Sequence, residues 1–167
     1  MFPHLHAFNL RQWIDSDEDW GRIRTIWEDS DFWAFVTRGP NPRTEFHINP
    51  GDEIFNQLDG ELHLHYVEPS GRRALAVLKP GELFLMPAGV PHSPRREEGS
   101  LTFVIERKRR PHEIDRWVWY CEECDGQLYE VQREAGDRRD VVAQGTAALR
   151  SEERLRTCGR CGHVSVI

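Results

Sequence analysis

The hydrophobic and polar positions of this chain change their spacing near Arg22. Before that point, Leu10, Trp13 and Ile14 recur three and four residues apart or adjacent, which places them on one face of an α-helix. Asn9 stands just before them and is a residue type that caps helix N-termini. We therefore predict a short amphipathic helix after Asn9, and a region of a different kind from Arg22 onward.

Beyond Arg22, short runs rich in β-branched and aromatic residues alternate with turn residues. The separators include Asp59-Gly60 and Pro80-Gly81, which favour tight turns. The runs predicted as strands are 22–27, 32–37, 44–48, 54–58, 61–67, 74–78, 82–86 and 101–106. Many short strands at such regular spacing predict an all-β protein, built as an antiparallel sandwich or barrel.

Length and charge narrow the range of partners. The 167 residues suffice for one well-cored domain and a small appendage. A formal net charge of -6 gives no general attraction to phosphate backbones or anionic lipid, so we expect no nucleic acid and no membrane as partner. No apolar run approaches the roughly 20 residues of a membrane helix, and the first residues lack the pattern of a secretory leader. These features predict a cytoplasmic protein.

Cysteines gather near the end of the chain in two Cys-x-x-Cys pairs, formed by Cys121, Cys124, Cys158 and Cys161. In a reducing compartment such pairs are more often metal ligands than disulfides. Two pairs with this spacing close a tetrahedral site of four thiolates. Because a closed site has no position for a substrate, it indicates a role in structure or electron transfer.

The character of the chain shifts again after about Pro111, to a charged segment opened by the aromatic run 117–120. The stretch 132–156 has few large apolar side chains, so it could hardly build a core unaided. We predict one domain over 1–112, which includes the N-terminal helix, and a small C-terminal segment over 113–167 organised by the cysteine metal site.

Two separated patterns carry the candidate ligands of another metal. In the first, five residues separate His47 from Glu53 and six more separate Glu53 from Gly60. In the second, a stretch rich in glycine and proline over 81–91 leads to His92. Together they resemble the two motifs of the cupin superfamily, whose fold is a small double-stranded β-barrel, or jelly roll, with one metal inside.

The usual first cupin motif has a second histidine two positions after the first, and here that position is Asn49. The departure leaves His47, Glu53 and His92 as the predicted ligands. Two imidazoles and one carboxylate form the facial set that holds Fe(II) and keeps positions open for substrate and O2. The alternative is that these are surface or core residues of a sugar-binding or structural cupin.

His63 and His65 form a rival pair on one face of a predicted strand. No glutamate follows them at the interval that the motif requires. We therefore interpret both as solvated or hydrogen-bonded strand residues.

The residues around these motifs resemble the 3-hydroxyanthranilate 3,4-dioxygenase family. The matching runs are 38–47, Gln57 with Gly60, 91–96, 104–107 and 119–121. The chain is most similar to the bacterial form, which carries a C-terminal pair of Cys-x-x-Cys motifs. The resemblance extends from about Asn9 to Cys161, which is nearly the whole chain.

The resemblance implies a catalytic Fe(2+) on the three predicted ligands, and it counts Glu53 among the substrate-binding residues. It implies that Arg43 and Arg96 hold the substrate's carboxylate with their guanidinium forks. Glu106 would accept a proton or hydrogen bond from the substrate's hydroxyl or amine. Without the resemblance, Glu106 would be interpreted as a surface ion pair with one of the basic residues over 107–110.

The implied reaction opens 3-hydroxyanthranilate with O2 to give 2-amino-3-carboxymuconate semialdehyde, on the route from tryptophan to quinolinate and NAD. The resemblance also implies a homodimer, and a rubredoxin-like iron in the cysteine site, for which zinc is the obvious substitute. Animal members of the family lack the cysteine motifs, which implies that ring opening does not need that second metal.

The chain departs from the family at Asn56, where an aromatic residue is usual, and in its turn over 49–51. We expect neither to touch a proposed ligand, but either to reshape the pocket mouth. Two other functions stay open: a cupin dioxygenase for another ortho-aminophenol or catechol, and a non-catalytic metal-binding regulator whose cysteine module contacts nucleic acid as a zinc ribbon. The acidic balance and the pair Arg43 and Arg96 count against the regulator.

Overall fold

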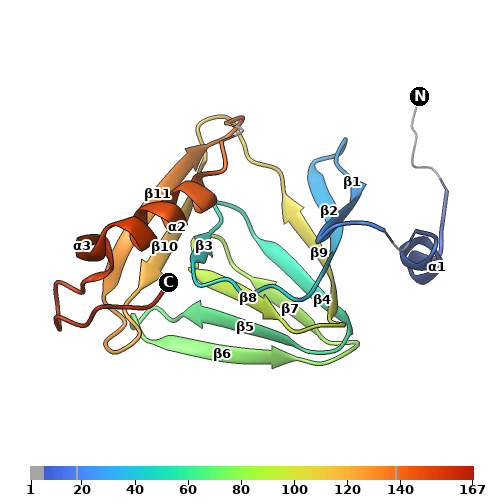
Figure 1. Ribbon diagram of the computed structural model, residues 1–167. Coiled ribbons are helices and arrows are strands. Elements are labelled where there is room, and N and C mark those ends of the chain that lie inside the picture. The colour runs from blue at the N-terminus through green and yellow to red at the C-terminus, as the bar shows by residue number, and fades with distance from the viewer. Residues whose placement is uncertain (1–5, 18, 138) are drawn as a thin grey trace.

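The computed structural model describes residues 6–17, 19–137 and 139–167, which form two antiparallel sheets and three helices (Figure 1). One sheet has five strands in the order β1-β2-β9-β4-β7, and the other has six in the order β11-β10-β3-β8-β5-β6. The strands are β1 (Ile23–Trp27), β2 (Phe32–Arg38), β3 (Phe46–Ile48), β4 (Glu53–Asp59), β5 (Leu62–Val67), β6 (Arg73–Leu78), β7 (Leu83–Met86), β8 (His92–Arg96), β9 (Leu101–Arg107), β10 (Ile114–Tyr120) and β11 (Gln127–Glu134). The helices are α1 (Leu10–Asp15), α2 (Val141–Ser151) and α3 (Glu153–Arg156). The predicted all-β class is confirmed.

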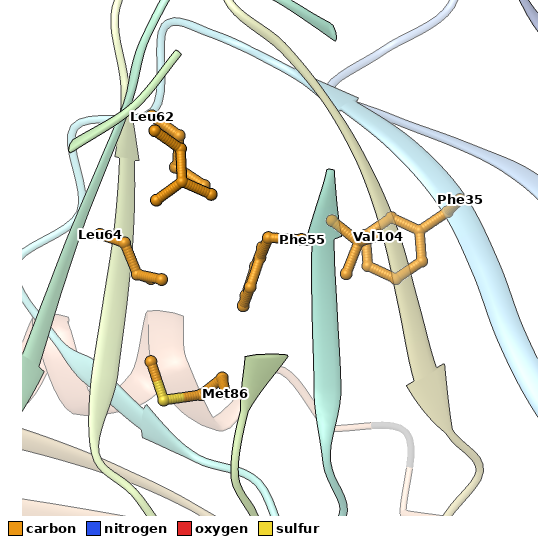
Figure 2. Close-up of a cluster of buried hydrophobic side chains, with 7 residues drawn as sticks. Phe35, Phe55, Leu62, Leu64, Met86 and Val104 are labelled. Carbon is orange, nitrogen blue, oxygen red and sulfur yellow. The ribbon is translucent and has the colours of Figure 1, made fainter. Parts of the chain in front are cut away.

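The two sheets enclose an apolar core. Phe55 and Val104 come from the five-stranded sheet, and Leu62 and Leu64 come from the six-stranded sheet (Figure 2). Both leucines are fully buried, which stabilises the fold by about 1.5–3 kcal/mol for each side chain. Successive side chains of a strand point to opposite faces. Because Phe55 points into the core, Glu53, two residues earlier on β4, faces the same interior.

Helix α1 covers the outer face of the five-stranded sheet. Ile14 packs with Trp20 and with Val36 of β2 in a second buried cluster. The backbone N–H of Gln12 donates to the Asn9 side chain at 2.9 Å. The predicted N-cap and the predicted N-terminal helix are therefore both confirmed.

All eight predicted strands are present, with boundaries within two residues of the predicted ones. Strand β8 was not predicted because it contains Pro94, which has no N–H to donate to a ladder. The structure accommodates this proline because its carbonyl accepts from the Asn41 side chain at 3.0 Å, on the side away from β5. The ring nitrogen points to that same side, so the pairing of β8 with β5 loses no donor there.

Strands β10 and β11 continue the six-stranded sheet beyond residue 112. β10 pairs with β3 on one side and with β11 on the other. Helix α2 lies against these strands (Figure 1). Its Val141 and Leu149 are buried beside Trp117 and Trp119 of β10. The C-terminal segment thus takes its core from the sheet, which supplies the support that its few apolar residues need. In the described part of the chain, no helix combines the length and apolar character needed to cross a membrane.

Helix α2 packs closely on the sheet at Gly145: a Cβ there would lie 2.8 Å from the ring of Trp119 and 3.0 Å from Val131. We expect Gly145→Val to lower the free energy of unfolding by about 1–3 kcal/mol, because the buried Trp119 ring cannot move aside and the added side chain would overpack the core. Gln144→Val places the same side chain at an exposed position of the same helix and is the control. Urea denaturation measures both variants, and equal losses would contradict this account of the packing.

Candidate metal centre

Three side chains from three strands converge inside the barrel. His47 lies on β3, Glu53 begins β4 and His92 begins β8. His47 stands opposite His92 in the pairing of β3 with β8, and the turn over 49–52 brings Glu53 back beside them. Their ligand atoms all lie within 4.8 Å of one another. The structure therefore brings together the residues predicted as ligands.

The hydrogen bonds of the two imidazoles fix which nitrogens face Glu53. Nδ1 of His92 lies 2.9 Å from the carbonyl of Val90, so it carries a proton, and Nε2 faces Glu53 Oε2 at 3.3 Å. Nε2 of His47 lies 2.7 Å from Asp115, and its Nδ1 faces Glu53 Oε1 at 3.4 Å. Two nitrogen lone pairs and a carboxylate thus point at one another, an arrangement that fits a divalent metal.

The electrostatics of the site keep Glu53 charged. Burial acts to raise the pKa of Glu53, but the neighbouring His92 and His47 outweigh it and hold the pKa well below its ordinary value. Burial acts to lower the pKa of His47, and the neighbouring carboxylates of Asp115 and Glu53 raise it overall. The carboxylate therefore stays an anion, which is the form that binds a cation.

Glu106 stands across from Glu53 in the pairing of β4 with β9. Burial first, and then the charge of Glu53, raise the pKa of Glu106 to about 7. The Glu106 carboxylate accepts from Arg109 at 3.0 Å and from Asn49 at 3.2 Å. The ion pair expected as the alternative for Glu106 does form, with Arg109, but Glu106 is buried beside the candidate ligands and not on the surface.

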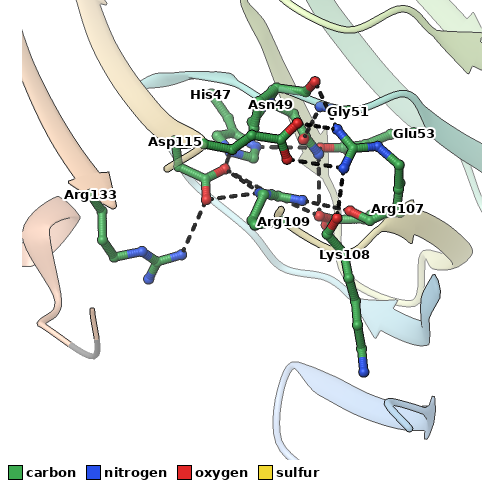
Figure 3. Close-up of polar contacts among 12 residues, drawn as sticks. His47, Asn49, Gly51, Glu53, Arg107, Lys108, Arg109, Asp115 and Arg133 are labelled. Atoms are coloured by element: carbon green, nitrogen blue, oxygen red, sulfur yellow. Dashed lines mark hydrogen bonds and ion pairs between the residues drawn. The ribbon is translucent and has the colours of Figure 1, made fainter. Parts of the chain in front are cut away.

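The expectation that Asn49 touches no proposed ligand is wrong. Its side chain is buried, and its amide donates to Glu53 as well as to Glu106 (Figure 3). The cause is the turn after β3, in which the Gly51 backbone N–H donates to the side-chain oxygen Oδ1 of Asn49 at 2.8 Å and so turns the side-chain NH2 inward. Asn56 lies elsewhere and donates to the carbonyl of Glu82 at 3.3 Å.

Arg43 and Arg96 line, together with the three converging residues, a cavity of about 330 Å³. That volume is within the range of small-molecule sites. Arg96 is buried and donates to Thr102 at 2.9 Å, and burial and then the nearby Arg43 lower its pKa to about 9. Among the described residues, no carboxylate pairs with Arg96, whereas Arg43 lies 2.9 Å from Glu45. Arg96 is thus a buried cation whose charge an anion bound in the cavity would compensate.

The cavity also has walls that the sequence did not reveal, formed by Trp33, Arg109, Trp117, Arg133 and Val142. Trp117 stacks on the His47 ring, with centroids 4.9 Å apart and planes at 12°. The aromatic and β-branched residues at 117–120 could have suggested a strand here, but they do not indicate that its Asp115 and Trp117 face the site.

The four cysteines gather in a second cluster. Their sulfur atoms lie within 4.8 Å of one another, with 3.6 Å between Cys121 and Cys161 and 3.5 Å between Cys124 and Cys158. These distances exceed a disulfide bond. Backbone N–H groups of Cys161 and Arg160 lower the pKa of Cys158 to about 6, which favours the thiolate that binds metal.

His63 and His65 lie on the outer face of β5. They alternate along the strand with Leu62 and Leu64, which point into the core. His63 faces Glu61 at 3.3 Å. Burial, and then Arg95, lower the pKa of His65 to about 4. Within the described residues neither belongs to a group of ligand side chains, in agreement with our interpretation of this pair.

Comparison with known proteins gives the same family as the sequence motifs. The family model described as 3-hydroxyanthranilic acid dioxygenase matches residues 2–146. A protein of Bacillus cereus named 3-hydroxyanthranilate 3,4-dioxygenase is 37% identical, and the match covers 98% of this chain and 94% of the relative. A protein of the same name from Paraburkholderia phytofirmans is 38% identical, and the match covers 98% of this chain and 97% of that relative.

Among solved structures, a cupin-2 domain containing protein from Shewanella frigidimarina is similar to this chain. It superposes with a TM-score of 0.51 at 20% identity, over 61% of this chain and 95% of that chain. This likeness bears on the fold alone, and it confirms the predicted cupin barrel.

The two metal clusters should be lost separately. We expect His47→Ala to remove one metal ion per chain while the cysteine metal remains, and His63→Ala on the outer face of β5 to remove none. Cys121→Ser should lower the melting temperature, because binding energy at a structural site is folding energy, and it should spare the barrel metal in the folded protein. Metal analysis with thermal unfolding checks this; a folded cysteine variant without barrel metal would contradict it.

Proposed function

We infer that this chain, which belongs to the 3-hydroxyanthranilic acid dioxygenase family, opens the aromatic ring of 3-hydroxyanthranilate with O2. One observation carries the assignment beyond family membership: a centre of two histidines and one carboxylate shares a cavity with the buried, unpaired guanidinium of Arg96. The first suits the hydroxyl and amine of the substrate, and the second suits its carboxylate. The product of this reaction is 2-amino-3-carboxymuconate semialdehyde, on the route to quinolinate and NAD.

His47, Glu53 and His92 are the proposed ligands of a catalytic Fe(2+), because their donor types match the set that holds this ion. When bound, the ion would bring substrate and O2 together and let electron density pass from the ring to O2. The described residues supply three donors at this centre, so further coordination positions would be available to the reactants. Glu53, which touches both imidazoles, also borders the space that substrate would occupy.

Arg96 and Arg43 are the proposed carboxylate clamp. Arg96 uses Nε and Nη1 for bonds to Thr102 and to the carbonyl of Pro94, which hold its side chain in one orientation. A substrate carboxylate in the cavity would compensate the charge that burial disfavours. Arg43 would contribute while it keeps its contact with Glu45, since a guanidinium offers several donors.

Glu106 is the proposed acceptor of the substrate's proton. Among the described residues, both of its hydrogen bonds, from Arg109 and Asn49, go to Oε2, so Oε1 remains for substrate. A pKa raised to about 7 by burial and by Glu53 suits a group that takes up and releases a proton near neutral pH. The same contacts hold the carboxylate in a fixed position, which is the condition for efficient proton transfer.

The alternatives differ from this proposal at the carboxylate clamp. A dioxygenase for a simple ortho-aminophenol or catechol would need the metal centre but not the buried Arg96. A nucleic-acid-binding regulator would need neither a cavity at the metal nor a cation buried within it. Neither alternative therefore accounts for a guanidinium buried in the cavity at Arg96.

We also propose that the cysteine cluster holds rubredoxin-like iron or zinc and that the chain acts in the cytoplasm as a homodimer. Unlinked thiols suit a reducing compartment. Leu83 and Leu85 are exposed on β7, at the edge of the five-stranded sheet, and a second copy would cover them. Sedimentation equilibrium tests the assembly.

The carboxylate clamp makes the sharpest prediction. 2-Aminophenol keeps the hydroxyl and amine of the substrate but lacks its carboxylate, so we expect kcat/KM to fall by about two to four orders of magnitude. The estimate rests on about 1.5–3 kcal/mol for each hydrogen bond to a charged group, counted for two such bonds. Arg96→Ala should narrow the gap between the two compounds, because the variant has less to lose when the carboxylate is absent.

Steady-state kinetics of both proteins on both compounds give the comparison. Arg95→Ala removes the neighbouring guanidinium, which lies on the outer side of β8 opposite His63, and should leave the gap unchanged. Equal activity of the unaltered chain on both compounds would exclude a clamp and favour a general aminophenol dioxygenase.

A further inference from the structure

We propose that Asp115, on β10, is a positioning residue that determines which nitrogen of His47 is available to the metal. The proposal rests on the metal centre of the proposed function. It concerns a residue outside the two cupin motifs, 68 positions away from the histidine that it contacts.

The geometry at His47 carries the proposal. Oδ1 of Asp115 lies 2.7 Å from Nε2 of His47, and both side chains are almost fully enclosed (Figure 3). A carboxylate can only accept at this distance, so Nε2 must carry the proton. A neutral imidazole has one N–H and one lone pair, which leaves the lone pair on Nδ1. Nδ1 is the nitrogen that faces Glu53, at 3.4 Å.

The opposite tautomer would defeat the site. A proton on Nδ1 would occupy the direction in which the metal must bind and would donate to Glu53 instead. Nε2 would then present a lone pair to the Asp115 carboxylate, and the two would repel. Asp115 therefore selects the ring form that binds metal, as partners of metal-bound histidines commonly do.

Asp115 is itself held firmly. Arg109 donates through Nε to both carboxylate oxygens at 2.9 Å, and its Nη2 lies 2.8 Å from Oδ1. Arg133 approaches from β11 at 3.9 Å. The stacked ring of Trp117, two residues along the same strand, prevents His47 from tilting away. Strand β10 thus fixes the histidine from its edge and from its face.

Arg109 extends the arrangement to the substrate side of the cavity, because its Nη2 also donates to Glu106 at 3.0 Å. One guanidinium therefore sets the position of two carboxylates with different tasks. Asp115 orients a ligand, and Glu106 is the proposed proton acceptor. A change at Asp115 should affect metal binding first, and Glu106 only through Arg109.

The test compares Asp115→Asn with Glu113→Gln. Glu113 lies two residues before Asp115 and also pairs with an arginine, Arg107. The control therefore removes the same charge from a comparable ion pair. Titration of the metal-free full-length chain with Co(II), after subtraction of the same titration of His47→Ala in which the cysteine cluster alone binds, measures affinity at the barrel site. We expect Asp115→Asn to weaken it by roughly 10- to 100-fold, Asp115→Glu to restore part of the loss, and Glu113→Gln to leave it unchanged.

A second readout reports the tautomer directly. Nitrogen-15 NMR of the histidine rings in the zinc-loaded, unaltered chain should show His47 protonated on Nε2. A proton on Nδ1 would overturn the proposal, whatever the stability of the variants, and so would an Asp115→Asn variant that binds Co(II) as tightly as the unaltered chain. Both measurements are made without turnover, so failure of 3-hydroxyanthranilate to react would overturn the proposed function and not the role of Asp115.

Discussion

The burial of negative charge is the constraint on which this structure depends. Glu53, Glu106 and Asp115 are each less than a tenth exposed and lie within one network of contacts. Removing a carboxylate from water costs several kcal/mol unless donors or cations compensate it. Here the compensation comes from two side chains. His47 contacts Glu53 and Asp115. Arg109 contacts Glu106 and Asp115. A divalent ion among the ligands would complete the charge balance.

The fold was largely predictable because its signals are local. Turn pairs such as Asp59-Gly60 separate runs whose composition favours strands, and eight of the eleven strands follow from them. Strand β8 was hidden by Pro94, which is tolerated only because its nitrogen points away from β5. Strands β10 and β11 were not predicted because the many charges of this segment favoured a loose one. On β11 the face away from the cavity carries Glu130, Gln132 and Glu134, and only its register with β10 shows that it is a strand.

The site was predictable only in part, for a related reason. The interval from His47 to Glu53 is set by one turn, so a motif records it. The contact between His47 and Asp115 depends on the register of two strands far apart in the chain, which no local pattern contains. Asn49 illustrates the opposite failure: its position was noticed, but the turn that points it inward is visible only in three dimensions.

Strand β10 connects features that the sequence seemed to separate. It carries Asp115 at one end, and Cys121 follows directly on its last residue, Tyr120. Helix α2, which packs on the same strand, contributes Val142 to the cavity wall. The segment beyond residue 112 thus lines the cavity at the candidate metal centre and also supports the cysteine cluster.

This topology also has a consequence for how the protein is made. Chains emerge from the ribosome N-terminus first and can begin to fold during synthesis. His47, Glu53 and His92 are all complete before Asp115 is added, so a nascent chain possesses its ligands while the His47 ring is still free to present either nitrogen. Only the arrival of β10 beside β3 removes that freedom. If Asp115 sets the His47 ring as proposed, that setting cannot be made before β10 has been synthesised and has paired with β3.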